Sequence, residues 1–127
     1  MDAKTLLKNK SICTLPWTGF ELEPNGNIKN CIISKTKLGN INKTNIKDII
    51  HGKENIELKQ SMLADSKPRN CAGCYLQEKH TTNPSSISSR LYYLKEIGAK
   101  TDLTLYDNVK NFSLKHVDLR WTNSCNQ

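Results

Sequence analysis

Four cysteines at organised spacing constrain this chain more than any other feature. Cys13 and Cys31 have 17 residues between them, and after a gap of 39 residues Cys71 and Cys74 follow as a C-x2-C pair. The two small residues inside that pair let both sulfurs face one ion or cluster. The sequence shows no signal peptide and no apolar run long enough to span a membrane, so we expect a soluble, cytoplasmic chain. Thiols stay reduced in that compartment, and the four cysteines are therefore the predicted metal ligands.

The length and charge of the chain argue against several functions. Its 127 residues predict one domain and are too few for a complete barrel enzyme. The net charge is +7, but 16 of the 19 basic residues are lysines scattered along the sequence. A nucleic-acid site normally clusters Lys and Arg beside stacking aromatic side chains. We therefore expect no nucleic-acid partner. The lack of a long apolar run likewise argues against a membrane protein.

A β-hairpin is predicted between the first two cysteines. Residues 17–23 have the pattern of a strand, residues 24–27 are typical of a tight turn, and residues 28–34 have the pattern of the returning strand. Because a hairpin folds the chain back on itself, it can place Cys13 and Cys31 at the same end.

Two helices are predicted after this hairpin. Gly39-Asn40 indicates a second turn, and Asn45 is a suitable N-cap for a helix over residues 46–50, whose isoleucines have helical spacing. That helix is expected to stop at Gly52. A second helical pattern covers residues 54–64. We expect the apolar positions of both helices to be core.

The C-x2-C pair is predicted to lie on a turn, because Pro68 ends the preceding helix. A thioredoxin-like dithiol site is the alternative for such a pair. That site places the motif at the start of a helix that follows a strand. Here a helix precedes the motif, so dithiol redox chemistry is not favoured.

The complete pattern is Cys13, 12 residues, Gly26, four residues, Cys31, a gap of 39 residues, and then Cys71-x2-Cys74. Over about residues 12–80 it resembles the SPASM and twitch auxiliary-cluster domains of radical S-adenosylmethionine (radical SAM) enzymes. The resemblance implies that the four cysteines hold an auxiliary [4Fe-4S] cluster between a hairpin and helices.

One departure favours the shorter, twitch type of domain. The full SPASM pattern continues with two further cysteines and holds two clusters, whereas Lys79, His80 and Pro84 occupy that region here. The resemblance therefore implies one cluster with four cysteine ligands and no open coordination site, which serves electron transfer or structural support. A histidine can replace a cysteine ligand, but we do not expect this of His80.

The last cysteine belongs to a different predicted segment. Residues 115–122 alternate apolar and polar side chains as a strand does, and a loop with Cys125 follows. A strand that ends in Asn-x-Cys-Asn resembles the first barrel strand of the radical SAM core. The resemblance implies that Cys125 is the first ligand of a second [4Fe-4S] cluster, which binds S-adenosylmethionine. It also implies that the sequence is an N-terminal fragment of a longer enzyme.

The predicted fold class is α+β: a β-hairpin and helices around a four-cysteine site, then a linker helix, then the first strand of a truncated α/β barrel. Apolar spacing predicts the linker helix over residues 86–98, and residues 99–114 show no pattern. The predicted divisions are 1–10 (N-terminal tail), 11–80 (auxiliary cluster domain), 81–114 (linker) and 115–127 (start of the core).

Iron-sulfur cluster binding in a radical SAM enzyme is the predicted function. The fragment alone is not expected to be catalytically complete, because its core motif has one cysteine instead of three. The full-length protein would modify a peptide or small-molecule substrate and take electrons from a donor such as flavodoxin or ferredoxin. Two alternatives stay open: a four-cysteine zinc module with a structural or binding role, and a metal-free basic adaptor.

Overall fold

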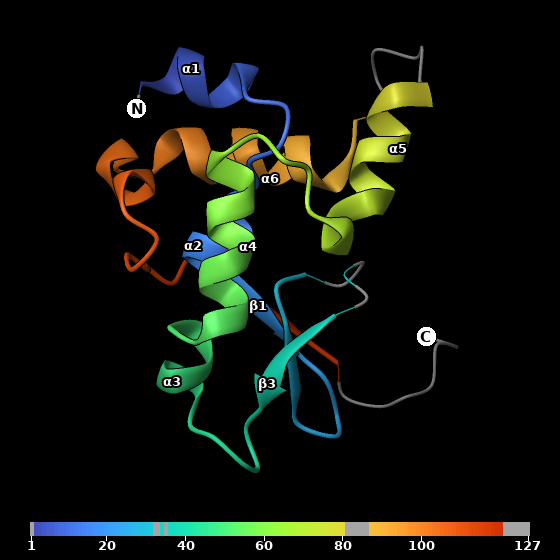
Figure 1. Ribbon diagram of the computed structural model, residues 1–127, viewed down its shortest axis with the longest axis vertical. Helices are drawn as coiled ribbons and strands as arrows, with labels where there is room; N and C mark the ends of the chain where they lie inside the picture. The colour runs from blue at the N-terminus through green and yellow to red at the C-terminus, as the bar shows by residue number, and fades with distance from the viewer. Residues whose placement is uncertain (1, 32–33, 35, 81–86, 121–127) are drawn as a thin grey trace.

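The predicted β-hairpin is present and forms part of a four-stranded sheet. The computed structural model describes residues 2–31, 34, 36–80 and 87–120 (Figure 1). Neighbouring strands among the first three are antiparallel, whereas the fourth runs parallel to the first. In the order β3-β2-β1-β4, the strands are β1 (Gly19–Leu22), β2 (Asn27–Lys29), β3 (Lys37–Asn40) and β4 (His116–Leu119).

Gly26 makes the hairpin turn possible. Its φ of +91° lies in the left-handed region that side chains other than glycine rarely adopt. The N–H of Gly26 donates to the carbonyl of Glu23 at 2.9 Å, and the N–H of Glu23 donates to the carbonyl of Asn27 at 2.9 Å. The predicted turn is confirmed, but the returning strand is shorter than predicted because β2 ends at Lys29.

The first strand starts two residues later than predicted. Trp17 and Thr18 belong to a single helical turn, α2 (Leu15–Thr18). Pro16 favours this turn, because its fixed φ suits the first positions of a helix and its missing N–H would have no partner there. The correction matters for the site, since α2 begins two residues after Cys13.

The predicted second turn is wrong in position. Gly39 and Asn40 lie in β3, and the turn follows at residues 41–44. A Cβ on Gly39 would come within 2.9 Å of the Ile49 side chain. Gly39 therefore allows β3 to approach the helix that carries Ile49 and does not serve a turn.

Both helices predicted from apolar spacing are present. They are α3 (Ile46–Ile50) and α4 (Lys53–Leu63). The side chain of Asn45 accepts a hydrogen bond from the N–H of Asp48 at 2.9 Å, which confirms the predicted cap of α3.

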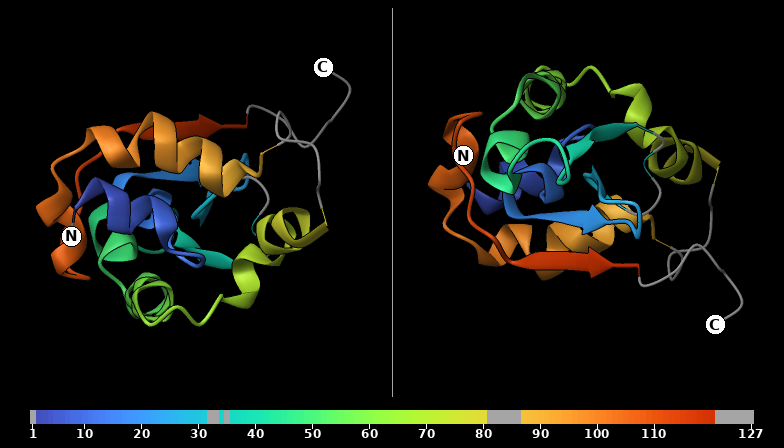
Figure 2. Two further views of the ribbon diagram at one scale, coloured as in Figure 1. Left: turned by 90° about the horizontal axis from the view of Figure 1, so that it is seen from above. Right: turned by 90° about the horizontal axis from the view of Figure 1, so that it is seen from below.

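Three further helices are grouped at the end of the molecule opposite the hairpin turn (Figure 1), and the view from above shows the first and last of them side by side (Figure 2). The last of them, α6, is shorter than the helix predicted over residues 86–98. The featureless region after it contains two short 3-10 helices. The elements are α1 (Ala3–Lys8), α5 (Ala72–His80), α6 (Ser89–Glu96), and the 3-10 helices η1 (Arg69–Cys71), η2 (Gly98–Lys100) and η3 (Leu103–Asp107).

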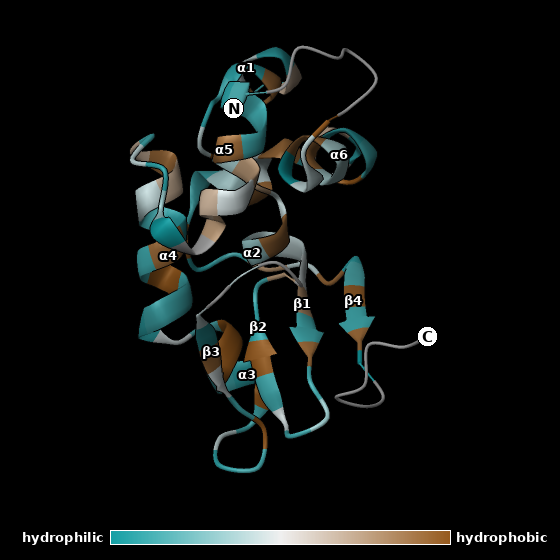
Figure 3. Ribbon diagram, turned by 90° about the vertical axis from the view of Figure 1, so that its right-hand side faces the viewer, coloured by the Kyte–Doolittle hydropathy of each residue, from teal (hydrophilic) through white to brown (hydrophobic). Residues whose placement is uncertain are grey.

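Two apolar clusters hold these elements together. The smaller one joins the sheet to α3 through Ile28, Leu38 and Ile49. The larger one surrounds the cysteines and draws on α2, α4, α6 and η3. Residues 1–10, expected to be a tail, contribute Leu6 of α1 to this larger cluster. Figure 3 shows apolar residues, coloured brown, in both α3 and β2.

Lys59 of α4 anchors the segment that leads to β4. Its side chain is fully buried, and Nζ donates to the carbonyls of Val109 at 2.9 Å and Asn111 at 2.8 Å. The ammonium also lies 5.4 Å from the centroid of the Trp17 ring. Burial lowers the pKa of Lys59 to about 8. No carboxylate in the described part of the chain forms an ion pair with it.

The predicted α+β class is confirmed. The strand predicted over residues 115–122 is present at 116–119, and its parallel pairing with β1 was not predicted. Whether β4 opens a radical SAM barrel stays a prediction, as do the predicted domain divisions. None of the described helices is both long and apolar enough to cross a membrane.

Candidate metal centre

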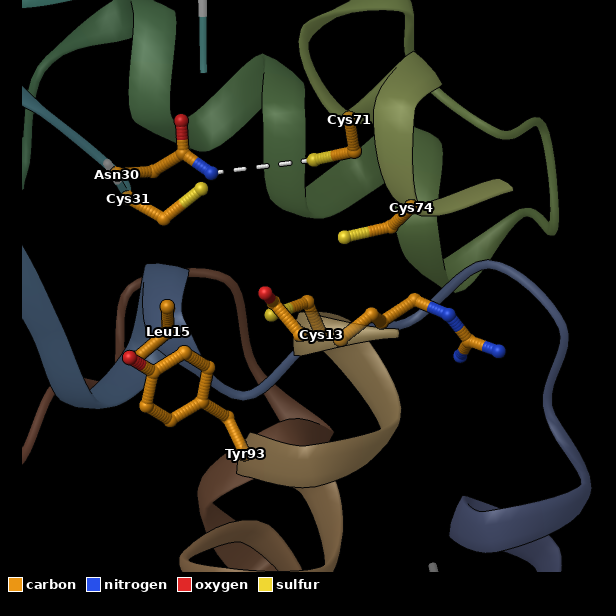
Figure 4. Close-up of a pocket in the computed structure, with 9 residues that line it drawn as sticks. Cys13, Leu15, Asn30, Cys31, Cys71, Cys74 and Tyr93 are labelled. Atoms are coloured by element: carbon orange, nitrogen blue, oxygen red, sulfur yellow. Dashed lines mark hydrogen bonds between the residues drawn. The ribbon is translucent and has the colours of Figure 1, made fainter. Parts of the chain in front are cut away.

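The four predicted ligands line one buried cavity. None of them is more than 8% exposed. They come from three separate segments, because Cys13 precedes α2, Cys31 follows β2, and the C-x2-C pair spans η1 and α5. Figure 4 shows the four sulfurs directed into the shared space. The described lining residues are Cys13, Leu15, Asn30, Cys31, Cys71, Cys74, Ser89, Arg90 and Tyr93.

The C-x2-C pair lies at the start of a helix, which corrects the predicted free turn. Cys71 is the last residue of η1, and Cys74 is in the first turn of α5. Residues three apart in a helix share a face, so this position directs both sulfurs to one side. The motif follows α4 and η1, not a strand, and the chain around it therefore lacks the thioredoxin arrangement.

Burial opposes ionisation of these thiols. Desolvation raises the pKa of Cys13 well above its usual value and raises the pKa of Cys71 to about 12. Neighbouring cysteines add to both shifts, because a second thiolate would be a like charge in the same cavity. Desolvation also raises the pKa of Cys74. A positively charged metal centre would reverse this balance, since thiols that ligate a metal lose their protons.

Asn30 supplies a side-chain donor to the site. Its Nδ2 donates to Sγ of Cys71 at 3.8 Å, as Figure 4 shows. The side chain is 1% exposed, and its Oδ1 has no hydrogen-bond partner within the described ranges. Burying an amide with one unsatisfied atom is costly. The orientation of Asn30 is therefore best explained by its bond to the sulfur.

Backbone N–H groups act on two more sulfurs. The N–H of Leu15 favours the thiolate form of Cys13, although burial still raises the pKa of that thiol. The N–H groups of Arg90 and Ser89, at the start of α6, act in the same way on Cys74. Free N–H groups at the N-terminus of a helix stabilise negative charge. Donors of this kind suit ligands that carry thiolate charge.

Arg90 fastens α6 to both parts of the ligand set, a role that the sequence did not predict. Nε donates to Oε2 of Glu78 at 2.8 Å, and Nη2 makes a second bond to the same carboxylate. Nη1 donates to the carbonyls of Asn9 at 3.0 Å and Ile12 at 2.8 Å. Glu78 lies on the C-x2-C helix α5, and Ile12 immediately precedes Cys13. One buried side chain thus ties together the segments that present three of the four cysteines.

Comparison with known families agrees with the cysteine pattern. The family model named SPASM, an iron-sulfur cluster-binding domain, matches residues 13–75. This segment of the chain is therefore similar to SPASM domains. The match begins at Cys13 and includes all four cysteines of the cavity, which confirms the predicted resemblance. No curated protein and no solved structure matches the chain.

The SPASM cysteines share a cavity without forming a site for a single ion. In residues 2–31, 34, 36–80 and 87–120, no group of three or more His, Cys, Asp or Glu side chains could hold one metal ion. Tetrahedral zinc needs four sulfurs that are about 3.8 Å apart, given a Zn–S distance of about 2.3 Å. In an iron-sulfur cluster each thiolate binds a different iron, so the four sulfurs can lie farther apart than those around one zinc ion.

The other two candidate residues lie apart from the SPASM cavity or outside the described chain. His80 is the last residue of α5, is exposed, and is not one of the described residues that line the cavity. Cys125 lies outside the described residues, and its role stays a prediction. By contrast, α6 lies beyond the matched range but forms part of the cavity wall.

Proposed function

We propose that Cys13, Cys31, Cys71 and Cys74 hold one [4Fe-4S] cluster, and that this is the auxiliary cluster of a radical SAM protein. The observation that carries the proposal is that three distant segments of a SPASM-like domain bring four thiols into one buried cavity. A cluster ligated by four cysteines leaves no iron free for substrate. The domain then serves electron transfer or structural support.

The chemistry of the cavity fits such a cluster. All four donors are sulfurs, and the wall between them is formed largely by carbon, from Leu15, Tyr93 and the cysteine side chains. N–H groups point at sulfurs from a side chain and from two backbone segments. When bound, the cluster supplies one-electron redox chemistry whose potential depends on such hydrogen bonds and on exclusion of water. In this chain Asn30 and the start of α6 provide hydrogen bonds to the sulfurs, and both line the buried cavity.

Zinc is the second candidate, since four thiolates also suit that ion. The match to an iron-sulfur cluster-binding family supports the cluster instead. Zinc sites of this kind also usually pair two short C-x2-C motifs, whereas Cys13 and Cys31 are 18 positions apart.

The radical SAM part of the proposal concerns β4 and the loop with Cys125. Three features support it. The first is that β4 lies at the edge of the sheet. The second is that Val117 and Leu119 on that strand are 38% and 51% exposed. The third is that parallel strands in α/β folds are normally covered on both faces, so an exposed parallel strand is expected to pack against a further part of the protein. We propose that Cys125 begins the motif that holds a second [4Fe-4S] cluster with S-adenosylmethionine. A peptide or small molecule would be the substrate of the complete enzyme.

Anaerobic reconstitution with iron and sulfide tests the cluster against zinc. We expect about four irons and four sulfides per chain, with broad absorbance in the visible region. Purification with one tightly held zinc, and no colour after reconstitution, would refute the proposal. Electron paramagnetic resonance of the reduced sample then distinguishes a [4Fe-4S] cluster from a smaller one.

A further inference from the structure

A groove lies beside α5. It is lined by Lys10, Lys67, Tyr75, Leu76, Glu78 and Lys79. These residues come from the segment before Cys13, from the link between α4 and η1, and from α5 itself. The groove therefore follows the same segments that present the cysteines.

The groove carries an excess of positive charge. Lys10, Lys67 and Lys79 are all exposed, and none of them forms an ion pair with a residue in the described ranges. Glu78 is the one acidic residue among the described lining residues, and its carboxylate is bound by Arg90. Glu78 interacts electrostatically with Lys67, so one carboxylate faces three lysines and the groove keeps an excess of positive charge for an acidic partner.

Lys67 is held in place by its backbone. Its φ of +49° is in the left-handed region, which is uncommon for a residue other than glycine. The N–H of Lys67 donates to Oγ of Ser11 at 2.9 Å. This bond fixes the link between α4 and η1 against the segment before Cys13. The lysine thus projects from a fixed backbone, not from a free loop.

An apolar centre lies among these charges. Leu76 is 56% exposed, and the neighbouring Tyr75 is half-buried. An apolar centre with a charged rim is the usual composition of a protein-protein interface. Nucleic-acid sites instead stack bases on free aromatic rings beside arginines. No arginine lines the groove among the described residues, and the Tyr75 hydroxyl is bound to the carbonyl of Ser11 at 2.7 Å.

Only one layer of side chains separates the groove from the cysteine cavity. Tyr75 lines the groove and packs against the core cluster that contains Cys71. The guanidinium of Arg90, which lines the cavity, lies 6.0 Å from the centroid of the Tyr75 ring. A protein bound in the groove would sit next to the wall of the cavity.

We propose that this groove docks a small acidic electron-transfer protein, with Lys10, Lys67 and Lys79 around Leu76 as the contact surface. The proposal rests on the proposed cluster, because proximity to the cavity gives a redox partner its reason to bind here. Complementary charge would steer the encounter and make it depend on salt.

Binding of oxidised flavodoxin to the reconstituted chain tests the proposal. The variant is K10E/K67E/K79E, and the matched control is K43E/K47E/K110E, which changes the net charge equally at exposed lysines outside the groove. We expect the groove variant to weaken binding about tenfold or more and the control to stay close to the wild type. Circular dichroism and iron content confirm that both variants are folded and loaded.

Three outcomes would overturn the docking proposal. One is no binding by the wild type at low salt. Another is equal loss in both variants, which would indicate non-specific attraction. The third is groove-dependent binding of single-stranded DNA without binding of flavodoxin. A chain that takes up no iron would instead refute the proposed cluster, so the two failures are distinguishable.

Discussion

Arg90 of α6, which lines the cysteine cavity, forms a partly buried ion pair with two hydrogen bonds to Glu78 of α5. Desolvation acts to raise the pKa of Glu78, but hydrogen bonds from Arg90 and Ser88 outweigh it and lower the pKa overall. Because the SPASM match ends at residue 75, this pair lies outside the matched segment. We therefore expect cluster binding to depend also on residues outside the matched segment.

Removing one member of this pair should damage the site. In R90M, Glu78 would be a partly buried charge without its partner, at a cost of about 3 kcal/mol. Because Arg90 also holds the segment before Cys13, we expect a lower melting temperature and a lower iron content after reconstitution. R120M, at a more exposed arginine of the sheet, is the control. Equal iron retention in R90M and the wild type would contradict the role of Arg90.

The cysteines should divide into two sets. C71S should abolish cluster retention, because the loss of one of four ligands opens an iron to solvent. C125S should retain the same cluster, since Cys125 is expected to ligate a different one. Iron and sulfide analysis with visible absorbance measures both variants. If C125S also lost this cluster, the division of the chain into an auxiliary site and a core would be wrong.

Asn30 should influence the reduction potential of the cluster. Its Nδ2–H stabilises the negative charge on Cys71, and reduction adds negative charge to the site. N30A should therefore shift the potential to a more negative value while the iron content stays near that of the wild type. N42A, at an exposed asparagine of the turn after β3, is the control. A redox titration followed by electron paramagnetic resonance measures the shift, and an unchanged potential would refute the role.

Lys59 should make stability depend on pH. Its pKa is lowered to about 8 in the folded chain from 10.5, so between these values the unfolded chain binds more protons than the folded one. Stability then rises with pH, by about 1 kcal/mol from pH 7 to 9 for this group. In K59M that contribution disappears. Melting temperatures of both proteins at the two pH values give the difference, and parallel changes would argue against a shifted pKa.

Local features of the sequence could predict the cysteines, the Gly26 turn and the α3 cap. The cysteines are recognised by residue type and by their spacing along the chain. The turn and the cap depend on a few adjacent residues, namely a glycine at positive φ and an asparagine three residues before Asp48. Gly39 was misplaced for the same reason. A glycine that allows close packing against Ile49 has the same local signature as one that makes a turn.

The contacts of Arg90 could not be predicted, because its partners are distant in the sequence. Its acceptors lie at Glu78, Asn9 and Ile12, and nothing in a local pattern specifies them. One signal was available. Arg90 lies on the same face as Leu94 of α6, and a charged residue on an apolar helix face is usually paired when it is buried.

The parallel pairing of β1 with β4 also determines when the domain can be completed during synthesis. Gly19 pairs with His116, 97 positions later. At about 5–20 residues per second, a ribosome needs roughly 5–20 s to add that stretch. Once Cys74 has been added all four cysteines are present, while β4 and the segment anchored by Lys59 are still missing. Until β4 is added, we expect the thiols of the nascent chain to be more accessible to iron and sulfide than those of the finished domain.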